Sequence, residues 1–138
     1  MHMSRARFRW AGVLAGMALI AQAAPAQAAP APSPARKPVG VYTLTVAPEH
    51  GPGRGTAERL RCDPDGGTHH AASEACDQLA AVDGEVARIA ARPGPCTMES
   101  APVKVRADGT WHGKPRHFAE TYPNRCAAVR ETGGVLFR

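Results

Sequence analysis

The chain has 138 residues, with 17 Lys and Arg against 12 Asp and Glu and a formal net charge of +5. The first 28 residues predict an export signal, which is described below. Its removal leaves 138 − 28 = 110 residues, enough for one small domain with a modest core. Three arginines lie within that signal, so the remaining charge is 14 − 12 = +2, which removes the main support for nucleic-acid binding.

The first 28 residues have the parts of a signal peptide. Three arginines precede an apolar run over residues 10–21, which is too short to span a membrane. Small side chains follow at the spacing of a signal-peptidase site, so we expect cleavage after Ala28, with Ala23 and Ala26 as alternatives. The sequence therefore predicts a secreted protein that has no membrane association after signal removal.

The mature chain begins with a segment that differs in composition from the rest. Residues 29–39 are rich in Pro and Ala and have almost nothing to bury, which predicts a disordered arm ahead of one domain over residues 40–138. Residues 41–47 alternate apolar and threonine side chains, a pattern typical of a half-buried strand. A Gly/Pro-rich turn follows, and residues 56–62 predict a second, more polar strand.

A helix is predicted from Ser73 or Glu74 to about Ala91. Its apolar stripe, with steps of three and four residues, consists of Leu79, Val82, Val86 and Ile89. Asp83-Gly84 interrupts this stripe, and an interior Gly costs about 1 kcal/mol relative to Ala. We expect one bent helix rather than two short helices that meet at Gly84.

Residues 92–102 predict a stiff surface loop. Three prolines and a glycine prevent a helix or an inner strand there, and each proline has a fixed φ. Cys96 can tie the loop to the body of the domain, and Met98 is its one large apolar side chain. A protease cleft would accept such a loop and cut it slowly; the alternative is an ordinary surface loop held by a disulfide.

The C-terminal third predicts a hairpin, a helix and a strand. Alternating residues from 103 onward indicate a strand, Asp108-Gly109 is a strong hairpin turn signal, and the returning strand ends near Tyr122. The remaining elements are a short helix over residues 124–131 and a last strand over residues 134–137. The sequence thus predicts an α+β fold: an antiparallel sheet of about five strands, one long helix, one short helix and two disulfides.

The four cysteines all lie in the mature part, at Cys62, Cys76, Cys96 and Cys126. An even count in a short exported chain predicts two disulfides, for which three pairings exist. Pairing of neighbours would close loops of about 15 and 31 residues and stabilise the fold by roughly 3–4 kcal/mol each. No Cys-x-x-Cys is present, which argues against a zinc cluster or a thioredoxin-like site.

Catalytic signals are weak. Ser73 and Ser100 are the serines that follow the Pro-rich arm, and neither lies in a Gly-x-Ser-x-Gly elbow. His69-His70 offers two metal-binding side chains, but adjacent loop histidines more often donate hydrogen bonds or face water. We therefore expect no enzyme activity, no metal and no cofactor.

The segment from Cys62 to Leu79 closely resembles the signature of the Streptomyces-type subtilisin inhibitor-like family, a group of secreted serine protease inhibitors. The family pattern is Cys-x-Pro, Gly-x-His-Pro, then Ala-Cys-x-x-Leu, and here it is matched by Cys62-Asp63-Pro64, Gly67-Thr68-His69-His70 and Ala75-Cys76-Asp77-Gln78-Leu79. The departure is His70, where the family usually has Pro. Downstream, residues 108–114, Asn124-Arg125-Cys126 and the terminal Gly-Val-Leu-Phe also look like the family.

This resemblance implies an inhibitory role for the stiff loop. It implies the disulfides Cys62–Cys76 and Cys96–Cys126, a homodimer, and a reactive bond two residues after the third cysteine, between Met98 and Glu99. Contacts with the protease would come from Cys96, Thr97, Ser100 and Ala101 as well. Asn124 matches the asparagine that supports the loop from behind.

The residues at the bond limit the target class. Met98 favours subtilisin-like and chymotrypsin-like serine endopeptidases, because a trypsin inhibitor would carry Lys or Arg there. Glu99 is charged where the family more often has a small or apolar residue. Two alternatives stay open: a non-inhibitory secreted binding protein on the same scaffold, and a small exported hydrolase. No nucleic-acid partner is expected.

Overall fold

The computed structural model describes residues 28–138, so the predicted signal peptide lies, except for Ala28, outside the described residues. The chain divides into two units, residues 1–33 and 34–138. The described part of the first unit contains no helix or strand, and the side chains of residues 28–37 are exposed. Among the described residues no helix has the length and apolar character needed to cross a membrane.

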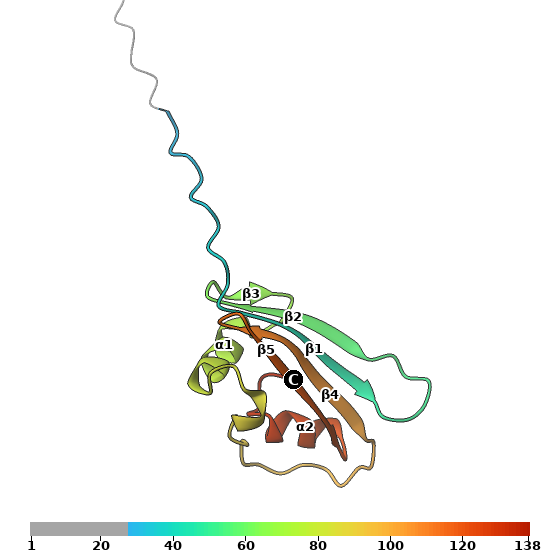
Figure 1. Ribbon diagram of the computed structural model, residues 1–138. Helices are drawn as coiled ribbons and strands as arrows, with labels where there is room; N and C mark the ends of the chain where they lie inside the picture. Colours follow the sequence, from blue (N-terminus) through green and yellow to red (C-terminus); the bar gives the residue numbers. More distant parts are fainter. Residues whose placement is uncertain (1–27) are drawn as a thin grey trace, which may run out of the picture. The chain divides into compact units, whose positions relative to one another are not determined.

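The second unit is built on one antiparallel sheet (Figure 1). Its strands, in the spatial order β3-β2-β1-β4-β5, are β1 (Gly40–Pro48), β2 (Thr56–Cys62), β3 (Gly66–Gly67), β4 (Val103–Trp111) and β5 (Lys114–Tyr122). Central strand β1 pairs on both sides, so Thr43 lies between Arg59 and Asp108. The alternation predicted for residues 41–47 is present, because Tyr42, Leu44 and Val46 are buried and the threonines between them are not.

The helices cover one face of this sheet (Figure 1). They are α1 (Ala72–Ala81), the short 3₁₀ helix η1 (Val86–Arg88) and α2 (Arg125–Glu131). The core lies between the helices and the sheet and contains Tyr42, Leu44, Leu60, Leu79, Val105, Trp111, Ala128 and Leu136. The predicted fold class is therefore confirmed: an α+β domain with a five-stranded antiparallel sheet, two α-helices and two disulfides.

The prediction of one long helix was wrong. Helix α1 ends at Ala81, and the chain then turns through Asp83 and Gly84, both with positive φ. A Cβ on Gly84 would collide with the ring of Trp111, and the Tyr42 hydroxyl donates to the Gly84 carbonyl over 2.7 Å. Tertiary contacts with the sheet thus select the break at Gly84, and only the short η1 follows it.

The hairpin turn lies four residues later than predicted. Strand β4 runs through Asp108 and Gly109, and the chain reverses at His112 and Gly113, which have φ of 47° and 75°. A Cβ on Gly109 would overlap the carbonyl oxygen of Val41 on the neighbouring strand. This glycine is therefore needed for close strand approach rather than for a turn.

The predicted C-terminal strand is also wrong. Residues 132–137 form turns, in which Gly133 and Gly134 have φ of 83° and 84°. Val135, Leu136 and Phe137 are nevertheless buried. The apolar residues at the C-terminus thus indicated burial correctly, but they do not pair with a strand. The fifth strand is instead the two-residue β3, which is too short to produce a periodic signal.

Candidate functional site

The predicted loop lies in the longest stretch of the domain without helix or strand, from residue 89 to residue 102. The run predicted to contact a protease, residues 96–101, lies in its outer part. The Met98 side chain is 99% exposed, whereas Cys96 is half-buried. Met98 is therefore fully available to a partner, and it is the one large apolar side chain of this loop.

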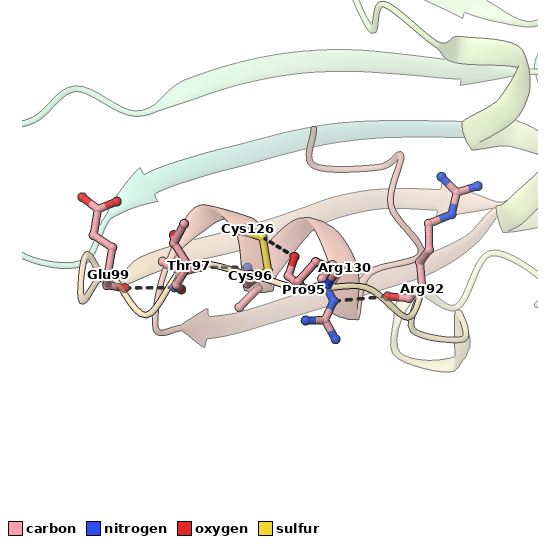
Figure 2. Close-up of a disulfide and its surroundings, with 9 residues drawn as sticks. Arg92, Pro95, Cys96, Thr97, Glu99, Cys126 and Arg130 are labelled. Carbon is pink, nitrogen blue, oxygen red and sulfur yellow. Dashed lines mark hydrogen bonds between the residues drawn. A yellow bond between two sulfur atoms is a disulfide. The ribbon is translucent and has the colours of Figure 1, made fainter.

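One disulfide ties this loop to α2. Cys96 is bonded to Cys126 with a Cα–Cα distance of 5.7 Å, and Figure 2 shows the loop running along the helix at this bond. The second disulfide joins Cys62 at the end of β2 to Cys76 in α1. These are the pairs that the family resemblance implied, among the three that the sequence left open.

Asn124 holds the loop from behind, and its side chain is almost fully buried. Its Oδ1 accepts from the N–H of Ala127 over 2.8 Å and so caps the N-terminus of α2. Its Nδ2 donates to the carbonyl oxygens of Thr97 at 3.2 Å and Glu99 at 2.9 Å. One amide therefore grips the backbone on both sides of Met98, whose own N–H and C=O have no hydrogen-bond partner within residues 28–138.

Both ends of the loop are also bonded to the body of the domain. Before the loop, the N–H of Arg92 donates to the carbonyl of Arg130 over 2.8 Å. After it, the N–H of Ala101 donates to the carbonyl of Pro123 over 3.0 Å, and the carbonyl of Pro102 accepts from Glu49. The sequence did not identify Arg130 or Pro123, because neither residue type has a local pattern that signals contact with a distant loop.

A hollow separates the loop from the helix that supports it. It has a volume of about 320 Å³ and is bordered by residues 96–100 together with Pro123, Asn124, Ala127 and Arg130. The contacts that cross from the body of the domain to the loop are the disulfide and the hydrogen bonds at Asn124 and at the two ends.

The other candidate residues have structural positions. The His69 side chain is buried; its Nδ1 accepts from the N–H of Ala71 over 3.1 Å and its Nε2 lies 3.2 Å from the carbonyl oxygen of Leu136. This geometry requires the proton on Nε2, which donates to Leu136. Glu58 and His70 lie close enough to form a metal-binding group with His69, but both ring nitrogens of His69 are already used by the backbone.

Residues 39–124, more than half of the chain, match the family described as subtilisin inhibitor-like. The chain belongs to this family. A relative described as a subtilase-type protease inhibitor, from Streptomyces coelicolor, is 38% identical over 137 residues and covers 92% of this chain and 93% of its own. Another, the trypsin inhibitor STI2 of Streptomyces longisporus, is 34% identical over 128 residues, covering 86% of this chain and 88% of its own.

A solved structure supports the same family assignment. Sermetstatin from Streptomyces caespitosus, crystallised in complex with Bacillus licheniformis subtilisin, superposes with a TM-score of 0.59 at 31% sequence identity. The match covers 71% of this chain and 96% of sermetstatin. The subtilisin inhibitor-like fold of the present chain is thus supported by sequence and by structure.

Proposed function

We propose that the protein is a secreted inhibitor of serine endopeptidases that presents the bond between Met98 and Glu99 as a substrate. The observation that carries the proposal is the Met98 side chain, which is 99% exposed on a loop that Asn124 and a disulfide hold in place. The described activities of the relatives, and the subtilisin bound by sermetstatin, support this function.

The shape of the loop would favour tight binding to a protease. In the proposed complex, Met98 fills an apolar specificity pocket of the protease. Cys96 and Thr97 line the protease cleft on the acyl side of the cut bond, and Glu99, Ser100 and Ala101 line it on the leaving-group side. Met suits such a pocket because its side chain is unbranched and polarisable. A loop that is already held in one shape avoids most of the ordering cost that a flexible substrate meets on binding.

The anchors of the loop would make net hydrolysis slow. When the protease serine attacks the Met98 carbonyl, the bond to the Glu99 nitrogen breaks and an acyl-enzyme forms with a free amine at Glu99. The acyl side stays bound through the Cys96–Cys126 disulfide, and the leaving side through the bonds of Asn124 to Glu99 and of Ala101 to Pro123. The amine therefore remains at a high effective concentration, and religation competes with attack by water.

The target class follows from the residues at the bond. Met98 favours subtilisin-like enzymes as targets. Chymotrypsin-like enzymes are further expected targets, because both classes accept large apolar side chains. Glu99 has no cation within 4.0 Å among residues 28–138. Its carboxylate would therefore be accepted best by a protease whose leaving-side subsite is basic or open to water.

Further parts of the proposal rest on the sequence and the family. Residues 1–28 would direct export and be removed, leaving an arm over residues 29–39 and the inhibitory domain over residues 40–138. The mature protein would act outside the cell, as a homodimer, and without membrane or nucleic-acid partners.

A titration tests the proposed function. Increasing amounts of the purified mature protein are added to a fixed amount of subtilisin, and residual activity is followed with a chromogenic peptide. We expect activity to fall linearly to near zero at one inhibitor domain per enzyme. No fall would support a non-inhibitory binding protein on this scaffold, and peptide turnover by the protein alone would support a hydrolase.

The variant Met98→Lys tests the proposed anchor residue. We expect affinity for subtilisin to fall by about 10- to 100-fold, because burial of a Met side chain contributes roughly 1.5–3 kcal/mol, and inhibition of trypsin to appear. The melting temperature should not change, since Met98 makes no packing contact in the free protein. Unchanged inhibition of subtilisin would show that Met98 is not the anchor.

A further inference from the structure

The first part of the loop lies against the body of the domain before the chain reaches Cys96 and Met98. We call residues 89–95 the incoming limb. The limb lies against the turn that follows α2: a Cβ on Gly133 would meet the Ile89 side chain at 2.5 Å, and a Cβ on Gly134 would meet the Arg92 side chain at 2.8 Å. Gln78 donates to the Gly133 carbonyl over 2.8 Å and holds this turn. The first residues of the incoming limb therefore pack against a turn that is itself held in place.

Arg92 and Arg130 are joined by two hydrogen bonds in opposite directions. The N–H of Arg92 donates to the carbonyl of Arg130 over 2.8 Å, and the Nε–H of Arg130 donates to the carbonyl of Arg92 over 3.3 Å. Figure 2 shows the Arg130 side chain reaching from α2 to the Arg92 carbonyl. Because the donor at Nε is charged, this bond is stronger than one between neutral groups of the same geometry.

Between this pair and the disulfide, the incoming limb has one residue whose backbone angles can change freely. Pro93 and Pro95 have fixed φ angles, but Gly94 lies between them and has no atom within 4 Å of the place where a side chain would begin. Without a bond at Arg92, the limb can swing about Gly94 while Cys96 stays attached. The direction in which the chain enters Cys96 and Met98 therefore depends on how firmly Arg92 is held.

We propose that Arg130 is a positioning residue for the reactive bond, a proposal that rests on the function proposed above. It acts through Arg92 and never touches the protease pocket. By holding the acyl-side limb, it keeps the Met98 carbonyl aligned with the Glu99 amine after the bond has been cut. With Asn124 and Cys126, it gives α2 three attachments along the loop, at its N-terminal cap, its first turn and its last turn.

The experiment compares Arg130→Ala and Arg130→Lys with the control Arg125→Ala. Arg125 lies on the same helix, is exposed, and its side chain makes no hydrogen bond within residues 28–138. Lys keeps the charge of Arg130 but lacks the Nε–H donor and its planar geometry. Each full-length mature variant is incubated with a catalytic amount of subtilisin until the ratio of cut to intact inhibitor is constant.

We expect this ratio to rise about tenfold in Arg130→Ala, the change that corresponds to losing one charge-assisted hydrogen bond. Arg130→Lys should behave like the alanine variant, and Arg125→Ala like the wild type. A ratio that stays at the wild-type value in Arg130→Ala, or that Lys fully restores, would overturn the proposal.

A second measurement does not depend on inhibition. Amide hydrogen exchange at Arg92 reports opening of the limb, and we expect it to be about tenfold faster in Arg130→Ala at an unchanged melting temperature. If the wild type does not inhibit subtilisin, the proposed function fails whatever the exchange result. If the wild type inhibits, and both the exchange rate and the cut ratio of Arg130→Ala match it, only the role of Arg130 fails.

Discussion

Two loops of this protein have similar local chemistry and opposite outcomes. Residues 63–71 contain one Pro and two Gly and lie between the disulfide-bonded Cys62 and Cys76. Residues 92–102 contain three Pro and one Gly and include Cys96, which is bonded to Cys126. The first loop turns its distinctive side chain inward, because His69 is 5% exposed and bonded to the backbone at Leu136. The second turns Met98 outward to 99% exposure.

The difference lies in which part of the molecule supplies the anchoring side chain. In the first loop, His69 belongs to the loop and reaches into the body of the domain. In the second, Asn124 and Arg130 belong to the body and bind carbonyl groups of the loop. A loop held by its backbone keeps its side chains free for a partner, so the first loop supports the fold and the second is available for recognition.

The largest expected effect separates the two disulfides. Replacing either the pair Cys62 and Cys76 or the pair Cys96 and Cys126 with Ala should lower the free energy of unfolding by about 3–4 kcal/mol. Only the second replacement should turn the protein into a substrate that subtilisin cuts without lasting inhibition, because it alone frees the acyl side. Denaturant titration and a timed digest measure both effects; rapid cutting at Met98 in the first double variant would break the comparison.

The next effect concerns the inward-facing loop. His69→Ala should lower the free energy of unfolding by about 2–3 kcal/mol, because it leaves the Ala71 N–H and the Leu136 carbonyl without their partner in a buried site. His70→Ala is the matched control, since His70 is exposed and should change stability by less than about 0.5 kcal/mol. Inhibition measured below the melting temperature should be the same in both; weaker inhibition by His69→Ala would mean that the loops are coupled.

Alkaline pH tests the scaffold beneath both loops. Burial raises the pKa of Tyr42 to about 12; the charge of Arg116 lowers this pKa and that of Asp83 raises it, each by less than burial does. Burial also raises the pKa of Tyr122, which adjoins the outward loop, to about 12, and the charges of Glu120 and Glu131 add to this rise. The folded pKa values exceed the unfolded value of 10.0, so their stabilisation is complete below pH 10 and is lost as pH rises toward 12.

The measurement is the free energy of unfolding across that range. The Tyr42 contribution amounts to about 2 kcal/mol, and Tyr42→Phe should flatten the decline while costing about 1 kcal/mol at neutral pH through the lost bond to Gly84. A decline as steep in Tyr42→Phe as in the wild type would show that Tyr42 is not its source.

Asn124→Asp separates the two roles of this side chain. Aspartate keeps the oxygen that caps α2, but it replaces the Nδ2 donor with a second oxygen that faces the carbonyls of Thr97 and Glu99, so the free energy of unfolding should fall by about 1–2 kcal/mol. Its loop should also be cut about tenfold faster, because the bonds to Thr97 and Glu99 are lost. Asn124→Ala should add a loss of about 1 kcal/mol of stability. Equal cutting rates in the wild type and Asn124→Asp would contradict the supporting role of this amide.

Local patterns predicted the parts of the fold in which one residue's neighbours in sequence are also its neighbours in space. The alternation in residues 41–47 predicted β1, and Asn124 marks the start of α2 as expected of a capping residue. The same patterns misplaced the turn at Asp108-Gly109, because a glycine needed for strand approach has the same letter as a glycine needed for a turn.

The sequence by itself determined that residues 92–102 form a stiff, exposed loop, since proline fixes φ and forbids helix and inner strand wherever the chain goes. Only the tertiary structure decided which residues hold that loop. Arg92 and Arg130 are 38 positions apart, and Thr97 and Asn124 are 27 apart. Their bonds exist because the sheet and α2 bring distant backbone groups within hydrogen-bond distance, which no local pattern records.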